Sequence, residues 1–262
     1  MSRSNGYIVG FAATTCVVCS IAVSGSAVAL KDLQVTSRIL DRQKNVLSVA
    51  DSERFTSDVL KQMSTEEVNA AFDEGIQARI VNLETGEYVE EVAGLDASTY
   101  DQKRALLDPE LSYEAPENAA KVIRIPSHGL VSQVMEGEEI TTLIIPVEGK
   151  GLWSTMYGFV ALDKDTTTIK GLTFYQHGET PGLGGEIDNP TWKAKWPGKK
   201  VFNDEWEKTV NVAKGMSRDE TYQVDGLSGA TLTARGVTYL LQFWLDDEAF
   251  GPYLDNFRED GV

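Results

Sequence analysis

The chain has 262 residues, 42% of them hydrophobic, which is enough to bury a core and fits one large or two small domains. The first 30 residues contain one basic residue and no acid, so the other 232 carry 23 basic and 40 acidic residues, a net charge of −17. Phosphate backbones repel so acidic a body, and we expect no nucleic-acid partner.

A 24-residue run without a charge, residues 7–30, follows a short N-terminal segment, residues 1–6. As a helix it is roughly 36 Å long, more than the hydrocarbon core of a bilayer, about 30 Å, so we expect a transmembrane helix. Apolar positions continue at helical spacing and predict a helical stalk over residues 31–50. A cleaved signal peptide is the alternative, because Ser26-Ala-Val-Ala29 resembles a small-residue cleavage site.

Few charges flank the apolar run, and counting them leaves its direction open. A short N-terminus before a long translocated domain is typical of a single-pass protein whose C-terminal domain is outside. We therefore expect residues 51–262 on the outer face of the membrane.

Both cysteines, Cys16 and Cys19, lie inside the apolar run. Their C-x-x-C spacing is found in redox and metal sites, but here no second ligand pair accompanies it. We expect them to act as small apolar residues and predict no metal site. The outer domain has no cysteine, which excludes a disulfide, a thiolate nucleophile and iron–sulfur ligation within it.

Residues 51–262 predict one α+β domain with an antiparallel sheet and flanking helices. The sheet is indicated by runs rich in β-branched and aromatic residues with short connections. These are a hairpin over residues 78–89 that turns at residues 84–86, and strands at residues 122–125, 140–147, 155–162 and 168–176.

Three helix starts have recognisable signals. Ser64-Thr-Glu-Glu67 is a capping box that opens a helix through Phe72. Asn189-Pro190 supplies an N-cap and a proline at the first helical position. From Thr231 onward the apolar residues at 237, 240, 241 and 244 share one helical face.

The third helix start has the form of a phosphate site. In Ser228-Gly-Ala-Thr231 two small residues let an anion approach the backbone, and free N–H groups and the helix dipole favour negative charge there. The alternative is a simple helix N-cap, which is the usual role of serine or threonine at such a position.

The wider run Asp225-Gly-Leu-Ser-Gly-Ala-Thr231-Leu-Thr233 resembles the recognition motif of flavin transferases, with an acid three residues before the Ser-Gly-Ala-Thr. The resemblance implies that a transferase moves the FMN part of FAD onto Thr231 and leaves a phosphoester. The implied cofactor is covalent FMN.

A second match extends the likeness nearly end to end. His177-Gly-Glu-Thr-Pro-Gly-Leu-Gly184, the run Gly151-Leu-Trp-Ser-Thr-Met-Tyr-Gly158 and the anchor resemble the C subunit of the bacterial sodium-translocating NADH:quinone oxidoreductases, the subunit with covalent FMN. This family implies an electron-transfer subunit of a Na⁺-pumping enzyme in the bacterial inner membrane, with a cytoplasmic N-terminus and a periplasmic domain. Its implied partners are the other subunits, a flavin transferase and the lipid bilayer.

The same resemblance implies an FMN-binding region over about residues 140–250 and no catalytic residue. The flavin would be surrounded by Trp153, Glu179, Thr180, Leu183, Gly184 and Lys214, and its phosphate would be held by Ser228, Gly229, Ala230 and Thr231, with Asp225 completing the motif. Trp153 and Leu183 are suited to an apolar wall, and Lys214 to offsetting negative charge. We expect His177, beside a tight turn, to be a hydrogen-bonding structural residue.

Three other functions compete with this one. The G subunit of the related ferredoxin-oxidising complex shares the anchor and the flavin motif. A free-standing membrane-anchored flavin reductase would need acid and base residues converging on a second pocket, and none stand out. A structural assembly subunit without cofactor is disfavoured by the intact motif.

Overall fold

The computed structural model describes residues 5–260 and divides into two compact units, Met1–Arg42 and Gln43–Val262. The first contains helix α1 (Asn5–Ala29) and the start of helix α2 (Lys31–Ala50). No α1 residue is buried, and among residues 5–260 it is the one helix long and apolar enough to cross a membrane. Cys16 and Cys19 are free and exposed on it. Most of the expected N-terminal segment 1–6 lies outside the described residues.

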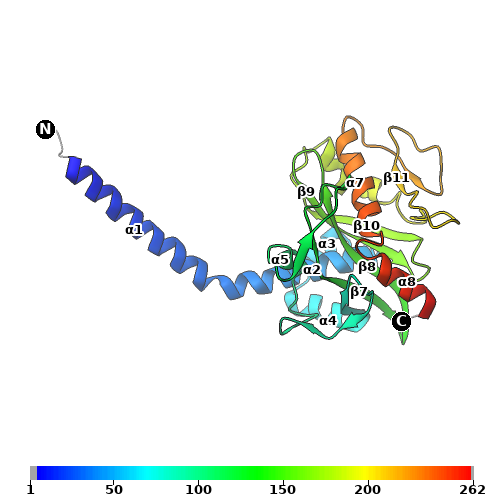
Figure 1. Ribbon diagram of the computed structural model, residues 1–262, viewed down its shortest axis with the longest axis horizontal. Helices are drawn as coiled ribbons and strands as arrows, with labels where there is room; N and C mark the ends of the chain where they lie inside the picture. The colour runs from blue at the N-terminus through cyan, green and yellow to red at the C-terminus, as the bar shows by residue number, and fades with distance from the viewer. Residues whose placement is uncertain (1–4, 261–262) are drawn as a thin grey trace. The chain divides into compact units, whose positions relative to one another are not determined.

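The second unit is built on a six-stranded sheet in the order β10-β9-β8-β7-β1-β2, in which all neighbours are antiparallel (Figure 1). This confirms the predicted α+β class. Its strands are β1 (Ile76–Asn82), β2 (Tyr88–Val89), β7 (His128–Glu136), β8 (Glu139–Lys150), β9 (Thr155–Asp163) and β10 (Ile169–Gln176).

Short elements complete the unit. The small strand pairs are β3 (Glu91–Val92) with β4 (Leu95–Asp96), β5 (Ser112–Glu114) with β6 (Arg124–Pro126), and the parallel pair β11 (Asn211–Val212) with β12 (Gln223–Val224). The helices are α3 (Ser57–Gln62), α4 (Thr65–Gly75), α5 (Gln102–Ala105), the 3₁₀ helix η1 (Gly184–Asp188), α6 (Pro190–Lys193), α7 (Thr231–Trp244) and α8 (Gly251–Asp260).

The local signals placed most of the longer elements correctly. Ser64 caps α4 through both bonds of the capping box, and the Asn189 side chain accepts a hydrogen bond at the start of α6. The strands predicted at residues 140–147, 155–162 and 168–176 correspond to β8, β9 and β10, and the 78–89 hairpin to β1 and β2.

Several elements were not predicted, the longest of them β7 and α8, and one was misplaced. β7 lies between β1 and β8, and α8 closes the chain. The strand predicted at residues 122–125 is instead β6, which lies outside the main sheet because it pairs with β5. β7 is nearly continuous in its burial, so it lacks the alternation that marks a half-exposed strand.

Helix α7 lies on β8, and two glycines bring the helix and the strand into close contact. A Cβ at Gly236 would lie 2.5 Å from the Lys150 carbonyl oxygen, and one at Gly149 would lie 2.7 Å from the Leu240 Cβ. The buried Trp244 indole donates a hydrogen bond of 2.6 Å to the Glu148 carbonyl. These contacts run along the helix and fix its first turn beside the end of β8.

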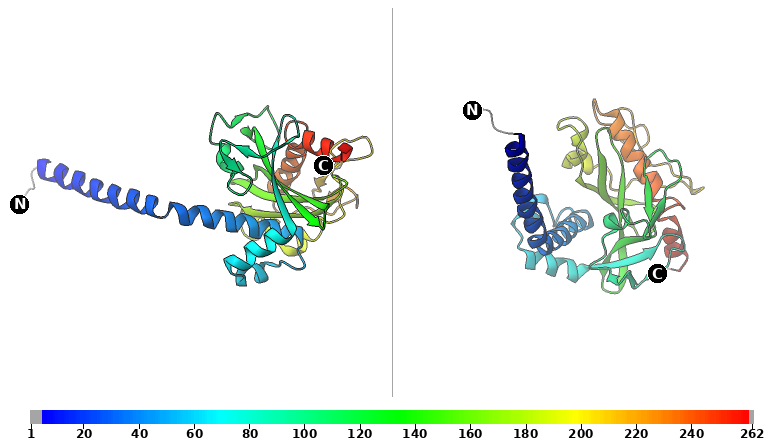
Figure 2. Two further views of the ribbon diagram at one scale, coloured as in Figure 1. Left: turned by 90° about the horizontal axis from the view of Figure 1, so that it is seen from below. Right: turned by 60° about the vertical axis from the view of Figure 1, so that its left-hand side comes forward.

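Helix α8 covers the same side of the sheet as α7 (Figures 1 and 2). The Gln133 amide donates to the hydroxyls of Tyr88 and Tyr253 at 2.6 and 3.0 Å, which joins α8 to the sheet. The C-terminal half of α2 packs on β10, where Val49 is buried and approaches Gly171. The globular unit therefore includes the last turns of α2.

The tight contact predicts that Gly236→Ala destabilises the protein. An alanine in an open helix position stabilises by up to about 1 kcal/mol, but at Gly236 the methyl group has to displace backbone, which costs about 1–3 kcal/mol. Urea unfolding measures the difference. Gly75→Ala, at the end of α4 with no atom within 4 Å of the new Cβ, is the control. Equal effects of the two changes would contradict the packing.

Candidate functional site

Thr231 is the first residue of α7, and its hydroxyl is available. The N-cap position belongs to Ala230, whose side chain makes no capping hydrogen bond. Thr231 is exposed, and its hydroxyl makes no hydrogen bond within residues 5–260. The simple N-cap interpretation of Thr231 is therefore wrong, and the threonine contributes no capping bond to the helix.

The residues before Thr231 form a turn that requires glycine. Gly229 has φ of +72°, in the left-handed region that side-chain-bearing residues rarely adopt. A Cβ there would also lie 2.9 Å from a Leu183 methyl carbon. Ser228 and Gly229 are exposed and Ala230 is buried, so the turn presents its backbone at the surface while α7 starts from the core.

The Glu179 carboxylate is buried, with 5% of the residue exposed, and accepts four hydrogen bonds. The backbone N–H groups of Leu152, Trp153 and Ser154 donate at 3.1, 3.0 and 3.3 Å. The Thr233 hydroxyl donates at 2.5 Å from the first turn of α7. One side chain thus joins the end of β8, its own loop and the start of α7.

The hydrogen bonds keep this carboxylate ionised. Burial acts to raise the pKa of Glu179, but the Thr233 hydroxyl and the three backbone N–H groups outweigh it, and the pKa lies below its ordinary value of 4.5. Glu179 is therefore a carboxylate at neutral pH.

Three of the predicted flavin-binding residues lie on neighbouring loops at the surface. Trp153 is 66% exposed, and its indole N–H donates a hydrogen bond of 3.1 Å to the Thr180 hydroxyl. Leu183 is 44% exposed and contacts the Gly229 turn. An exposed tryptophan and an exposed leucine on adjoining loops suit an apolar ligand face close to the start of α7.

Gly184 is buried against the side chains of Glu179 and Thr233. A Cβ on Gly184 would lie 2.6 Å from the Thr233 hydroxyl oxygen and 2.9 Å from a Glu179 carboxylate oxygen. The residue is glycine because the loop approaches the first turn of α7 this closely.

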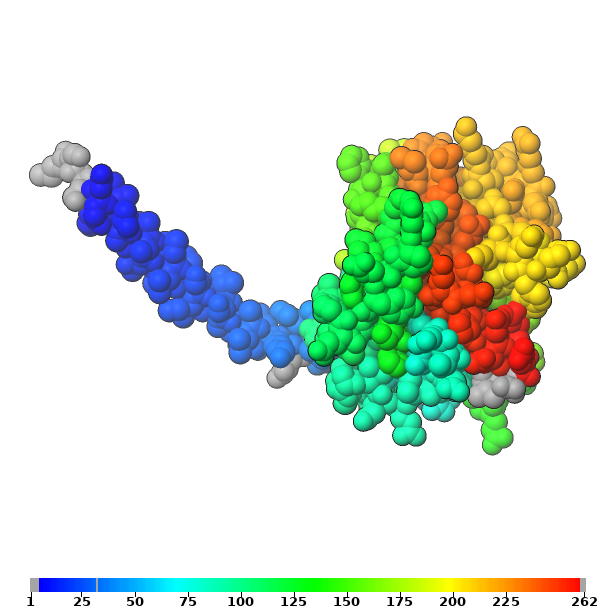
Figure 3. Space-filling model, in the orientation of Figure 1, coloured from blue at the N-terminus to red at the C-terminus, as the bar shows by residue number. Residues whose placement is uncertain are grey.

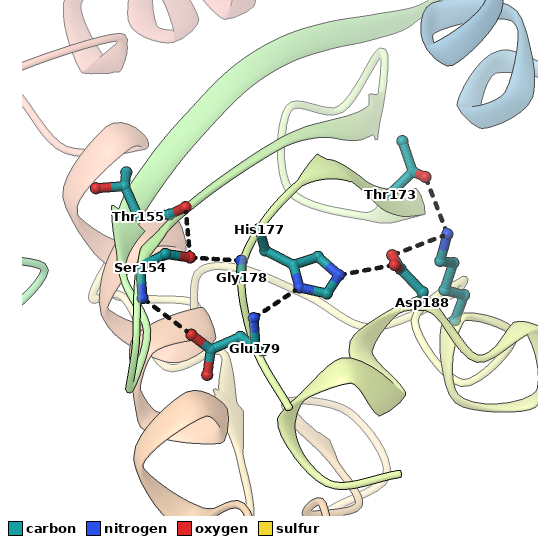
Figure 4. A network of polar contacts seen from close by, with 8 residues as sticks. Ser154, Thr155, Thr173, His177, Gly178, Glu179 and Asp188 are labelled. Atoms are coloured by element: carbon teal, nitrogen blue, oxygen red, sulfur yellow. Dashed lines mark hydrogen bonds and ion pairs between the residues drawn. The ribbon is translucent and has the colours of Figure 1, made fainter. Parts of the chain in front are cut away.

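His177 takes part in a structural network, as expected (Figure 4). Its Nδ1 accepts a hydrogen bond of 3.1 Å from the Glu179 backbone N–H, so Nε2 carries the proton and donates to Asp188 at 2.7 Å. The Ser154 hydroxyl accepts a hydrogen bond of 2.6 Å from the Gly178 N–H. The loop after β10 is thereby held to the loop after β8.

Asp225 fixes the position of the start of the motif through three hydrogen bonds. Its carboxylate accepts hydrogen bonds from the Lys195 ammonium at 2.5 Å and the Ser217 N–H at 2.6 Å, and these two contacts lower its pKa. Its carbonyl accepts the indole N–H of buried Trp192 at 2.9 Å. The 190–225 segment, in yellow and amber, and α7, in orange, lie side by side on the face shown in Figure 3.

Lys214 lies on the segment that packs against Gly226, the second residue of the motif. It is exposed and makes no ion pair within the part of the chain that the structure describes. Among residues 5–260 no hydrogen bond or ion pair joins Lys214 to the other predicted site residues.

Three further residues shape the site but were not identified from the sequence. Thr233 and Ser154 make the contacts described above, and a Cβ on Gly151 would lie 2.5 Å from a Glu179 carboxylate oxygen. These contacts join residues more than twenty positions apart, so local pattern could not reveal them. All three lie in the quoted runs, Thr233 in the motif and Gly151 and Ser154 in the run 151–158, but the runs assigned them no role.

An open hollow also exists at the opposite end of β8. It is lined by Glu138, Glu139, Ile140, Lys164, Asp165, Phe257 and Arg258. It shares no residue with the Thr231 site.

Comparison with known proteins identifies the family. Residues 151–246 match the model of the FMN-binding domain. Over its full length the chain is 41% identical to the C subunit of the Na(+)-translocating NADH-quinone reductase of Vibrio parahaemolyticus, covering 97% of that protein. The chain belongs to this C-subunit family. The match decides between the C and G subunits, and the matched FMN-binding domain contains the start of α7 and both loops of the site.

Other relatives agree. The corresponding C subunit of Pseudomonas aeruginosa is 44% identical, with 95% of this chain and 94% of that protein covered. The crystal structure of Shewanella oneidensis NqrC has a TM-score of 0.74 at 31% identity and covers 85% of this chain and 99% of its own. That of the C subunit from Parabacteroides distasonis has a TM-score of 0.65 at 29% identity, covering 86% and 96%.

The lowered pKa of Glu179 predicts a pH-dependent stability. A depressed folded-state pKa gives stabilisation that is fully present above the ordinary value of 4.5 and is lost as the pH falls through the folded-state pKa. Glu179→Gln should reduce the free energy of unfolding by about 2 kcal/mol at pH 7, with the difference shrinking below pH 4.5. Urea unfolding of both proteins at a series of pH values tests this. A difference independent of pH would contradict it.

Proposed function

We propose that this chain is an electron-transfer subunit of a Na⁺-translocating NADH-quinone reductase and carries FMN as a phosphoester on Thr231. The single observation that carries the proposal is the contrast between two threonines. Thr231 is exposed and its hydroxyl has no partner among residues 5–260, whereas Thr233 is 1% exposed and its hydroxyl is bonded to Glu179. One hydroxyl can react and the other cannot.

The start of α7 suits a phosphate. The first N–H groups of a helix have no partner within it, and its dipole favours an anion. The left-handed Gly229 exposes backbone next to Thr231, and the exposed Ser228 adds a hydroxyl. These residues would hold the phosphate, with Ala230 buried beneath them.

The neighbouring loops suit the ring system. Trp153 and Leu183 offer exposed apolar surface on the side of the site formed by the two loops, with the Thr180 hydroxyl bonded to the Trp153 indole. Gly184 keeps the loop close to α7, and Lys214 would offset negative charge on the loaded cofactor. When bound, FMN supplies one-electron redox chemistry, and the protein supplies position and electrostatics.

Loading requires a flavin transferase. The Thr231 oxygen would form a bond to the FMN phosphorus of FAD, the pyrophosphate bond would break, and AMP would leave as the hydroxyl proton is lost. The hydroxyl is consumed in this step, so Thr231 is a covalent tether, and we assign no catalytic residue to the chain.

The flavin would pass electrons between centres held by other subunits. Residues 7–30 carry no charge, so this span offers no charged residue to a Na⁺ pathway, and we assign ion transport to those subunits. A free-standing flavin reductase would reduce a small acceptor rapidly without partners, and the purified chain should not.

We further propose that α1 crosses the bacterial inner membrane, with residues 1–6 in the cytoplasm, the stalk at residues 31–50, and residues 51–262 in the periplasm. The length and apolar composition of α1 support a span, and no α1 residue is buried in the protein. The FMN-binding region would cover about residues 140–250, which contain the matched family domain.

Thr231→Ala should abolish covalent flavin without a loss of stability, because the side chain makes no capping bond. Protein co-expressed with its transferase is analysed by intact mass and by peptide mapping. Thr231→Ser, which keeps a hydroxyl, is the control and should still carry the FMN mass increment. Retention of the increment by Thr231→Ala would overturn the assignment.

The orientation predicts that protease added to intact spheroplasts degrades residues beyond 51 and leaves α1 protected. A periplasmic domain is accessible from outside, whereas a cytoplasmic one is shielded until the membrane is broken. An N-terminal peptide from residues 1–30 in the mature protein would show that the anchor is retained. Its absence would favour the cleaved signal peptide.

A further inference from the structure

The Glu179 carboxylate contacts three separate segments, and each segment carries a proposed flavin-binding residue. Its N–H donors lie at residues 152–154, which include Trp153. Its own loop carries Leu183, and the Thr233 hydroxyl belongs to the first turn of α7, which starts at Thr231. The carboxylate is thus the point where these segments meet.

The surroundings of the carboxylate leave no room for a larger group. Cβ atoms on Gly151 and Gly184 would lie 2.5 and 2.9 Å from its two oxygens. The carboxylate accepts all four of its hydrogen bonds and donates none. The position therefore requires a side chain that only accepts hydrogen bonds. A glutamine amide has nearly the same size but would turn its NH₂ toward one or more of these donors.

The negative charge at this position is stabilised by N–H and O–H dipoles, which leave the net charge unchanged. Within the described residues Glu179 makes no ion pair with lysine, arginine or histidine. Its pKa is lowered by these donors, so the charge persists at neutral pH. With no cation to neutralise it, the charge acts on whatever is bound beside Trp153 and the start of α7.

We infer that Glu179 is a positioning residue of the flavin site, which aligns Thr231 with the Trp153 and Leu183 loops and places one fixed negative charge beside the flavin. This rests on the proposed function. It adds a role to the expectation from the resemblance that Glu179 is one of the residues around the flavin, because the carboxylate is buried and its oxygens accept hydrogen bonds from protein donors.

Two substitutions distinguish the aligning role of Glu179 from the effect of its negative charge. Glu179→Gln removes both the charge and the matched acceptor, whereas Thr233→Val removes the bond to α7 and keeps the charge. Glu186→Gln is the control, because Glu186 lies in the same loop but bonds the Asn189 amide at 2.6 Å. The full-length chains are incubated with FAD and the purified flavin transferase, and the rate of covalent loading and the midpoint potential of the loaded flavin are measured.

Glu179→Gln and Thr233→Val should each load roughly 10-fold more slowly than the wild type, the effect of losing a hydrogen bond to a charged group. The potential of the loaded flavin should rise in Glu179→Gln, because removing a negative charge favours reduction, and should stay near the wild-type value in Thr233→Val. Glu186→Gln should load at the wild-type rate.

Wild-type loading rate or wild-type potential in Glu179→Gln would overturn the inference. If Glu179→Gln does not fold, as judged by circular dichroism, Thr233→Val decides, and its loading at the wild-type rate would overturn the inference. A wild-type chain that takes no flavin on Thr231 would instead reject the proposed function itself.

Discussion

The close contact between α7 and β8 determines where the start of α7 lies. Gly149 and Gly236 allow the helix to lie with its backbone near that of the strand, and larger residues would push the two apart. The helix start therefore has a fixed position relative to the end of β8. A group attached to Thr231 is therefore held at that position, because Thr231 is the first residue of α7, the longest helix of the globular unit among the described residues.

The same rigidity explains how exposed loops can form a defined site. Loops at the ends of strands are usually mobile, but here the loops after β8 and β10 share hydrogen bonds through Ser154, Gly178 and Glu179. Covalent attachment fixes one end of a cofactor, and the loops then need only to orient its ring. An electron carrier benefits from this arrangement, since tunnelling partners need a reproducible ring position while the ring edge stays accessible at the surface.

Much of the fold followed from local signals. The capping box at Ser64, the Asn189 cap and the apolar face of the last long helix depend on residues close in the chain, so their patterns were readable. Strand β7 is buried without alternation over residues 129–133, so it was missed. In the site, the motif predicted Thr231 as the attachment residue, but the role proposed for Glu179 depends on donors 25 to 54 residues away in the chain, which no local pattern encodes.

Phosphorus NMR of the loaded chain tests the proposed bond between the FMN phosphate and Thr231. A phosphoester to threonine has no second ionisation, whereas free or non-covalently bound FMN is a phosphomonoester that titrates with a pKa of about 6. FMN linked to Thr231 should give a single ³¹P resonance whose chemical shift does not change between about pH 5 and pH 8. A resonance that titrates through this range would contradict it.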